Sequence, residues 1–418
     1  MKWLLAYLAG AVVLLMPMGL RVLMRSEPTP MPLDAAAVAQ GKMLFTHEWA
    51  AKDPLSATGD GLGPVFNAKS CVACHEQGGL GGGGGLKHNV TTYFKAVAAD
   101  GKPAQGVIHA FAIDPQYQET LANASPQLPA LVRPTLVQVQ QVSGPGKQMA
   151  FNVQISQRNT PALFGAKLID DLPDSVIIAQ ERLQKLRWHT GGGENVPVGR
   201  ALRLPDGRLG KFGWKAQSTS LLSFVQAACA NELGLGNPGQ AQPTPLAGPG
   251  YQPKGLDLTQ EQCEQMTAFI AALHRPVERA PPDAQGQESV TNGRKHFTAV
   301  GCAECHVANL GSIEGLYSDL LLHRMGVELV GGGSYNAPPP GVPESPSHQA
   351  QPDEWRTPPL WGVADSAPYL HDGRAVTLVD AIRLHAGQAR ESALRFGQLS
   401  TEQQQDVINF LKSLRAPG

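Results

Sequence analysis

Apolar residues recur at helical spacing in two pairs of segments along the chain. Residues 34–47 carry such a stripe around Gly41, and the same Gly-x-x-x-Phe sequence returns at Gly293. Residues 258–276 are repeated in residues 399–417 at a constant offset of 141 positions. A glycine in an opening helix lets a closing helix cross it closely, because glycine has no side chain at the contact. The pattern therefore predicts a duplicated helical unit whose first and last helices pack together.

Alternating apolar and polar residues interrupt this helical pattern in the first copy. Residues 136–142 and 149–155 alternate on either side of a Ser-Gly-Pro-Gly turn sequence, which predicts a β-hairpin. A shorter hairpin is expected around Asp206-Gly207. Residues 331–353 are rich in Gly, Pro and Ser and are expected to form a surface loop. We therefore expect a mainly α fold of two helical domains in tandem, the first enlarged by β-hairpin insertions and long loops.

The first residues have the pattern of an export segment. An apolar run lies between Lys2 and Arg21, slightly shorter than the ~20 residues that span a bilayer comfortably, and no small-residue cleavage site precedes Arg21. Residues 1–25 are thus expected to be either a signal peptide or a membrane anchor, followed by a Pro-rich spacer at residues 26–39. The expected domains are residues 40–277 and residues 286–418.

Charge adds one exclusion. The formal net charge of the 418 residues is −1, which provides no basic field for nucleic acid. The export segment instead favours a periplasmic location, either free or anchored to the cytoplasmic membrane.

Two copies of the sequence Cys-x-x-Cys-His carry the clearest chemistry. Two thiols three positions apart can each form a thioether to a haem vinyl group, and the adjoining imidazole can reach the iron. With 6 Cys and 12 His in the chain, roughly 0.002 copies are expected by chance. Zinc is the alternative, but zinc half-sites usually come in pairs, whereas these copies lie 231 positions apart. We predict two covalently bound haem c groups in two cytochrome c-like domains, held by Cys71, Cys74 and His75 and by Cys302, Cys305 and His306.

The sixth iron ligand separates an electron carrier from an enzyme. At an offset of 157 positions, the segment after the second motif places His385 where the first copy has Ala228. His385 is therefore the predicted ligand of the second iron, with His323 and Met325 as alternatives. The first iron would be open, unless His88, which follows a glycine run, swings onto it as a removable ligand. The alternative for His88 is an ordinary solvated loop histidine.

Four segments together resemble the bacterial di-haem oxidoreductase family, which is related to the di-haem cytochrome c peroxidases and to MauG. They read GLGPVFNAKSCVACH at residues 61–75, TPALFGAKLID at 160–170, GKFGWKAQ at 210–217 and TPPLWGVADSAPYLHDGRAVTL at 357–378. The resemblance implies that Trp214 lies between the haems. It also implies a distal acid, for which Glu232 in an Asn-Glu-Leu-Gly sequence is the nearest match, although the family's proline is missing there.

Each of these assignments has a structural alternative. Trp214 could simply pack in the core, and Glu232 could be a carboxylate at a helix end. Cys229 and Cys263 lie on predicted helices, where either a disulfide or two buried free thiols would fit.

The expected function is that of a periplasmic di-haem c-type oxidoreductase, peroxidase-like, with electrons entering at the second haem and chemistry at the first. Hydrogen peroxide or a small molecule would be the substrate, and a small cytochrome, a cupredoxin or a quinol system the redox partner. A non-catalytic electron-transfer cytochrome and a MauG-like oxidation of another substrate are the alternatives. The sequence leaves open whether a calcium ion is bound as well.

Overall fold

The structure is a computed structural model, and it describes residues 33–95, 104–114, 117, 135–142, 148–188, 196–245, 251–333, 335 and 346–417. The predicted export segment lies outside the described residues. Within the described part, no helix is long and apolar enough to cross a membrane.

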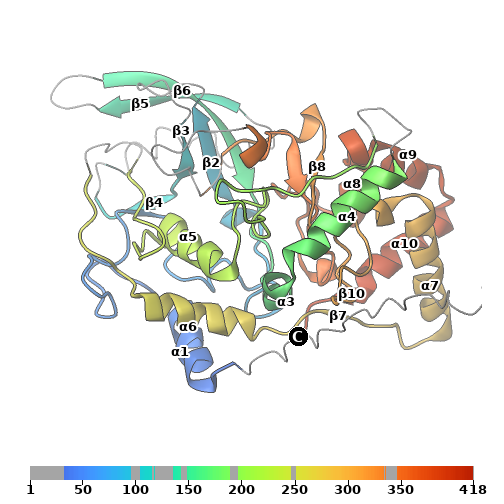
Figure 1. The fold of residues 1–418 in the computed structure, drawn as a ribbon, viewed down its shortest axis with the longest axis horizontal. Helices are drawn as coiled ribbons and strands as arrows, with labels where there is room; N and C mark the ends of the chain where they lie inside the picture. The colour runs from blue at the N-terminus through green and yellow to red at the C-terminus, as the bar shows by residue number, and fades with distance from the viewer. Residues whose placement is uncertain are drawn as a thin grey trace, which may run out of the picture. The chain divides into compact units, whose positions relative to one another are not determined.

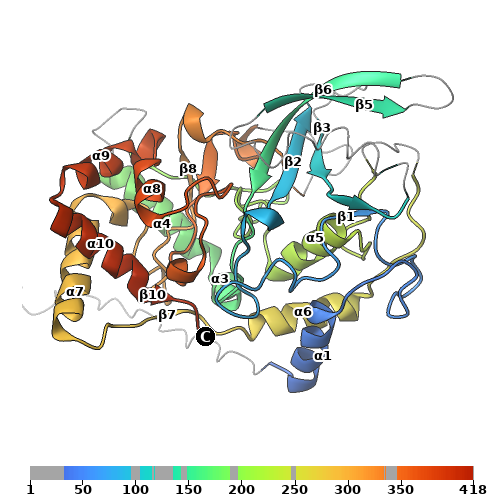
Figure 2. The same cartoon turned by 180° about the vertical axis from the view of Figure 1, so that it is seen from behind.

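Two crossed helix pairs are formed by the segments in which the sequence pattern repeats. Helix α1 (Ala35–Thr46) packs on α6 (Gln260–Ala271), and α7 (Ala284–Ala299) packs on α10 (Thr401–Ser413), as Figures 1 and 2 show from two sides. A Cβ at Gly41 would lie 1.8 Å from the Gln265 carbonyl oxygen. A Cβ at Gly293 would lie 1.9 Å from the Asp406 carbonyl oxygen. Both crossings therefore require glycine, as the sequence predicted.

The side chains at the helix starts explain the helix boundaries. Thr259 and Ser400 each accept a hydrogen bond from the backbone three residues on, and each is completed as a capping box by a glutamine. Ser220 caps α5 (Leu221–Leu233) and Thr377 caps α8 (Leu378–Arg383), so the segments aligned at the offset of 157 both begin helices.

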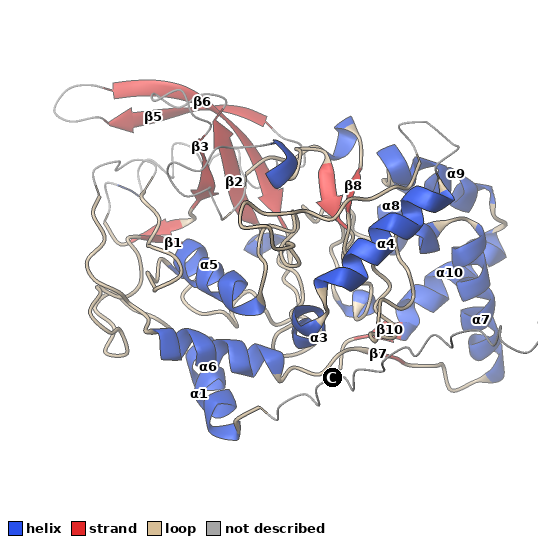
Figure 3. Cartoon of the chain, viewed as in Figure 1, coloured by secondary structure: helices blue, strands red, loops and turns tan. Residues whose placement is uncertain are grey.

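An antiparallel sheet of four strands, coloured red in Figure 3, stands in the first copy, in the order β3-β2-β6-β5. The predicted hairpin forms its outer part, as β5 (Thr135–Val142) and β6 (Gln148–Arg158). Strands β2 (Val90–Lys95) and β3 (Ala104–Ile108) were not expected. The β2 sequence Val-Thr-Thr-Tyr-Phe-Lys is rich in β-branched and aromatic residues, which is the signal that would have revealed it.

The other elements are short or connect these parts. The second predicted hairpin is a single bridge between Arg203 and Leu209. The remaining helices and strands are β1 (Val65–Phe66), η1 (Leu86–His88), β4 (Phe111–Ala112), α3 (Ala166–Asp171), α4 (Asp174–Arg187), β7 (Val277–Glu278), η3 (Cys302–Glu304), β8 (Leu322–Arg324), η4 (Val327–Leu329), η5 (Pro346–His348), β9 (Glu354–Arg356), η6 (Val363–Asp365), η7 (Gly387–Ala389), α9 (Arg390–Gln398) and β10 (Leu414–Arg415).

The buried side chains of the described residues form one large apolar cluster, one smaller cluster and a third of three residues, Leu202, Ala216 and Leu322. The second cluster lies around α7 and α10 and includes Phe297 and Phe410. The larger cluster contains Phe45 and Met266 of the first helix pair, but also Leu316 and Trp361 from the second sequence copy. Segments on both sides of residues 277–286 thus share a core.

Helix α4 reinforces this connection. The Gln184 amide donates to the Glu304 carbonyl oxygen at 2.8 Å and to Asp319 Oδ2 at 2.7 Å, so α4 is tied to the segment of the second Cys-x-x-Cys-His motif.

Candidate haem sites

The first motif forms a tight turn against the end of α1. The Val72 amide donates to the Phe45 carbonyl oxygen at 3.3 Å, and His75 Nδ1 donates to the Gly82 carbonyl oxygen at 3.0 Å. That bond fixes the tautomer in which Nε2 carries the lone pair that a metal needs. Burial lowers the pKa of His75 to about 4, which keeps the imidazole neutral.

The glycine run after the first motif has a packing role. A Cβ at Gly82 would lie 1.7 Å from the Gln77 carbonyl oxygen, so only glycine lets the chain fold back around His75.

The second motif repeats this geometry in detail. His306 Nδ1 donates to the Tyr317 carbonyl oxygen at 2.9 Å, and burial lowers the pKa of His306 to about 4. Its ring centroid lies 6.4 Å from that of Phe297, close to the 6.2 Å between His75 and Phe45. Both imidazoles are therefore held by one backbone carbonyl and one aromatic ring of the opening helix.

Each motif faces a cavity. The first cavity, of about 110 Å³, is bounded by Cys71, Cys74 and His75 on one side and by Ala228, Cys229 and Glu232 of α5. The second, of about 300 Å³, is bounded by Cys302, Cys305, His306 and His385 together with apolar side chains.

His385 stands opposite His306 in the second cavity. The ring centroids are 6.5 Å apart, and His385 Nδ1 donates to the Ala381 carbonyl oxygen at 2.7 Å, which leaves Nε2 available. The competing ligand His323 has both ring nitrogens engaged, Nε2 with Asp319 at 2.8 Å and Nδ1 with Gln388 at 3.0 Å. Met325 also lines this cavity. Of the two histidines, His385 is the one with a free nitrogen.

Glu232 lies across the first cavity from the motif. Asn67 Nδ2 donates to Glu232 Oε2 at 2.7 Å. The other carboxyl oxygen, Oε1, is buried and makes no hydrogen bond to the described residues. Burial raises the pKa of Glu232, with the Tyr335 hydroxyl and Asn67 acting in the opposite direction. A carboxyl group in such a place is held ready to keep and release a proton.

Tyr335 was missed by the sequence analysis. It lines the first cavity, although residues 331–353 were expected to form a surface loop, and its neighbours Gly331 and Gly333 are buried. A low-complexity composition gives no signal for a single inward aromatic residue.

Trp214 lines both cavities, and its place between two haems stays a prediction. Its indole Nε1 donates to the Asn159 carbonyl oxygen at 2.8 Å, and its own carbonyl oxygen accepts from the Arg356 amide at 2.9 Å. The ring is thus fixed in the wall that the two cavities share.

His88 and the two remaining cysteines lie elsewhere. His88 Nδ1 is 3.6 Å from Cys74 Sγ, and His88 is not part of the lining of either cavity. Its role as a removable ligand stays a prediction. Cys229 and Cys263 are buried free thiols, which is one of the two alternatives left open.

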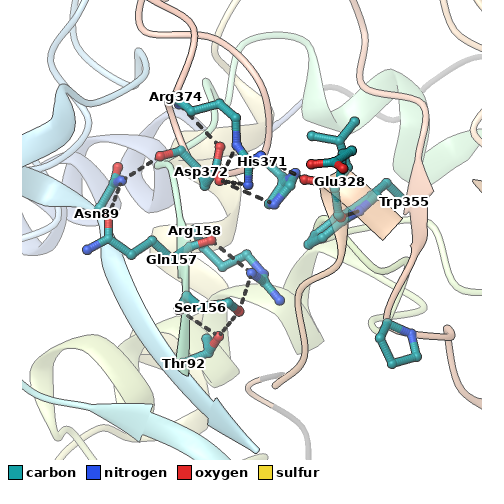
Figure 4. Close-up of polar contacts among 12 residues, drawn as sticks. Asn89, Thr92, Ser156, Gln157, Arg158, Glu328, Trp355, His371, Asp372 and Arg374 are labelled. Carbon is teal, nitrogen blue, oxygen red and sulfur yellow. Dashed lines mark hydrogen bonds and ion pairs between the residues drawn. The ribbon is translucent and has the colours of Figure 1, made fainter. Parts of the chain in front are cut away.

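A group of buried cations beside the shared wall was also missed. Lys215 Nζ lies 3.5 Å from the centroid of the Trp355 ring, and the Arg158 guanidinium carbon lies 4.6 Å from it. The same indole stacks on His371 at 3.7 Å with an interplanar angle of 14°. Figure 4 shows how Arg158, Trp355 and His371 converge from separate segments. Because the segments are far apart in sequence, no local pattern announces the group.

The donor sets fit two c-type haems. Each cavity presents two cysteine side chains and an imidazole whose Nε2 is free, which is the set that covalent haem attachment uses. Among the described residues, the potential metal ligands that cluster closely are Cys305, Asp319 and His323. This set is unlike the all-oxygen shell of calcium.

The geometry of the two motifs is suited to haem binding, and comparison with known proteins gives the family of the chain. It belongs to the di-haem oxidoreductases: the family described as "Di-haem oxidoreductase, putative peroxidase" matches residues 147–414. Hydrazine synthase subunit gamma of Kuenenia stuttgartiensis is 27% identical over 188 residues, which cover 40% of this chain and 52% of that protein. The match thus spans about half the length of this relative.

Two solved structures are also similar. The xenon-pressurized hydrazine synthase of Kuenenia stuttgartiensis has a TM-score of 0.40 at 17% identity, covering 92% of this chain and 89% of that one. A MauG-like protein associated with microbial copper homeostasis has a TM-score of 0.29 at 17% identity, covering 68% of this chain and 94% of that one.

Proposed function

We propose that the protein is a periplasmic di-haem c-type oxidoreductase with peroxidase-like activity, built from two cytochrome c-like helical domains in tandem. In each crossed helix pair, a Cys-x-x-Cys-His turn follows the first helix along the chain, and this repeated order supports the organisation. The proposed domains are residues 40–277 and 286–418, which share part of one core.

One observation carries the proposal: the two haem sites are unequal. Opposite His306 stands the imidazole of His385, whereas the first cavity has Ala228 at the aligned position and Glu232 one helical turn further on. A haem supplies one-electron transfer where both axial positions are filled and substrate chemistry where one is open. We therefore assign electron entry to the second site and catalysis to the first.

The residues of the first cavity suit the reduction of hydrogen peroxide. The reaction takes up two electrons and two protons and yields two water molecules. Glu232, protonated at one carboxyl oxygen, would donate a proton to the leaving oxygen, while Asn67 holds the other carboxyl oxygen in place. Trp214 would occupy the path between the sites, since it lines both cavities.

The redox partner is proposed to be a small cytochrome, a cupredoxin or a quinol system, and residues 1–25 would export the chain or anchor it to the cytoplasmic membrane. The two covalent haem c groups require attachment outside the cytoplasm, which supports the periplasmic assignment.

EPR of the oxidised and half-reduced protein, combined with peroxide turnover, tests the proposal. We expect one low-spin haem and one high-spin haem in at least one of these states, together with consumption of peroxide. Two low-spin haems in every state, without turnover, would instead support a non-catalytic electron-transfer cytochrome. The His88→Ala variant belongs in the same series, because a removable ligand would make its first haem high-spin in all states.

A high-spin first haem that does not consume peroxide would favour the MauG-like alternative, in which another substrate is oxidised at the same open position.

A further inference from the structure

Three buried cations border the wall between the two cavities. The exposed fractions are 7% for Arg158, 7% for Lys215 and 9% for Arg356. Among the described residues, no carboxylate lies within ion-pair distance of any of the three. An isolated buried charge is costly, so an anion bound beside these three basic groups would stabilise their charged forms.

The nearby carboxylates are already engaged. Asp372 pairs with Arg374 at 2.6 Å, and Glu354 pairs with Arg200 at 2.6 Å. The contact of Asp372 with Arg374 is visible in Figure 4, where Arg158 reaches toward Ser156. The protein therefore offers no free carboxylate to this group in its described part.

The hydrogen bonds of two of the cations go to neutral acceptors. Lys215 donates to the carbonyl oxygens of Gln351, Pro352 and Glu354 at 3.0, 2.9 and 2.6 Å. Arg158 donates through its Nη atoms to the Ser156 hydroxyl and to three carbonyl oxygens. These bonds fix both side chains in position, but they supply no direct carboxylate contact. Burial lowers the pKa of both side chains, and the more distant Asp372 and Glu354 only partly oppose that effect.

Arg356 retains unused donors. Its Nε donates to the Gly213 carbonyl oxygen at 2.9 Å, and Nη1 makes a longer contact of 3.4 Å with the Thr357 carbonyl oxygen. Nη2 has no acceptor among the described residues, although Arg356 is nine-tenths buried and lines the second cavity. An arginine with free N–H groups facing a cavity is suited to a carboxylate, which it can bind through two hydrogen bonds.

The three cations also flank the shared wall from both sides. Arg158 and Lys215 line the first cavity and Arg356 lines the second, while Trp214 belongs to both. Any anion bound in either cavity near this wall would therefore lie within the field of all three charges.

We propose that Arg158, Lys215 and Arg356 form one anion site that receives propionate carboxylates of both porphyrins, with Arg356 as the direct donor in the second cavity. The proposal rests on the placement of two haems under the proposed function. Propionates are the anionic groups that these haems would bring to the wall. The carboxylates would neutralise the buried charge and orient the propionate edges of the two haems toward Trp214.

A crystal structure of the haem-loaded wild-type protein tests the placement directly. We expect a propionate oxygen of the second haem within hydrogen-bond distance of an Arg356 Nη atom, and a propionate of the first haem beside Arg158 or Lys215. Two haems whose propionates all point away from the group would overturn the proposal and leave the proposed function intact. A small inorganic anion in the group, with the propionates elsewhere, would overturn it as well.

Redox titration of variants supplies a second readout. Removing a cation near a haem stabilises the oxidised form, so Arg356→Gln should shift the midpoint potential of the second haem downward, and Arg356→Lys should restore most of the shift. The matched control is Arg279→Gln, because Arg279 is exposed, donates to carbonyl oxygens near the C-terminus and lines neither cavity. Equal shifts in Arg356→Gln and Arg279→Gln, or none in either, would contradict a direct propionate contact.

Discussion

At the scale of single residues, each predicted haem imidazole is prepared by one hydrogen bond. His75, His306 and His385 all give Nδ1–H to a backbone carbonyl oxygen, so Nε2 is the free nitrogen in each case. The sequence shows which histidines adjoin the cysteines. It does not show the carbonyl partners, because the chain must first fold back over several residues to bring them near.

The His385→Ala variant should open the second haem. We expect its low-spin EPR signal to be replaced by a high-spin signal, since the second cavity loses the imidazole with a free Nε2. Stability should fall by about 1 kcal/mol, because the Ala381 carbonyl oxygen loses its donor. His348→Ala is the control, as His348 lines neither cavity. Persistence of the low-spin signal would transfer the role to Met325.

The Glu232→Gln variant should lose peroxide turnover by about 10²-fold or more, because an amide cannot donate a proton as a carboxyl group does. Burial raises the pKa of Glu232, so the acid form is retained below the raised pKa and lost as the pH rises through it. Peroxide turnover by the wild type should therefore decrease as the pH rises above the pKa of Glu232. The residual turnover of the variant should not show this decrease. Glu264→Gln, at an exposed position on α6, is the control.

Thermal unfolding of the wild type and of Glu232→Gln, measured over a range of pH, provides an independent check. A carboxyl group with a raised pKa in the folded state stabilises the fold below its unfolded pKa, and this contribution is lost as the pH rises through the folded pKa. Glu232→Gln should thus gain stability over the wild type with rising pH. If the melting temperatures of the two proteins instead change in parallel with pH, the pKa of the Glu232 carboxyl group is not raised by burial.

At the scale of elements, the opening and closing helices were predictable, whereas α4 and part of the sheet were not. The offset of 141 positions found both closing helices, because apolar spacing and capping residues are local signals. The offset of 157 aligned the starts of α5 and α8, yet α5 runs for 13 residues and α8 for 6. His385 therefore follows the end of its helix, whereas Ala228 lies within one.

Gly41→Ala and Gly293→Ala test the helix crossings. A methyl group at either position would meet a backbone carbonyl at under 2 Å, so the helices must separate, and each variant should lose about 1–3 kcal/mol or more of unfolding free energy. Gly397→Ala is the matched control, because a Cβ there meets nothing within 4 Å. That variant should instead gain about 0.5–1 kcal/mol, as alanine is the better helix former. Denaturant unfolding of all three distinguishes close crossing from a general effect of glycine replacement.

At the scale of the whole molecule, the sequence predicts what is local and misses what the fold assembles. The Cys-x-x-Cys-His turns are local, and Trp214 was nominated by resemblance. Lys215, Arg158 and Arg356 come together from three segments, so their shared environment exists only after the chain has folded. The common core has the same origin, since α4 contacts the second motif across more than a hundred positions.

Trp214 is one of the residues that line both cavities, and its replacement tests whether the two proposed haem sites work as one redox unit. Trp214→Phe removes the hydrogen bond from Nε1 to the Asn159 carbonyl oxygen and narrows the ring in the shared wall. We expect slower electron transfer from the second haem to the first in stopped-flow measurements, with a stability loss of about 1–2 kcal/mol. Both haems should keep their EPR signatures, because Trp214 binds neither iron.

Trp49→Phe is the control, since Trp49 is fully buried but lines neither cavity. If both variants slow the transfer equally, the effect comes from loosened packing; if neither does, electrons cross the wall by another route, and the position of Trp214 in both cavity linings reflects packing alone.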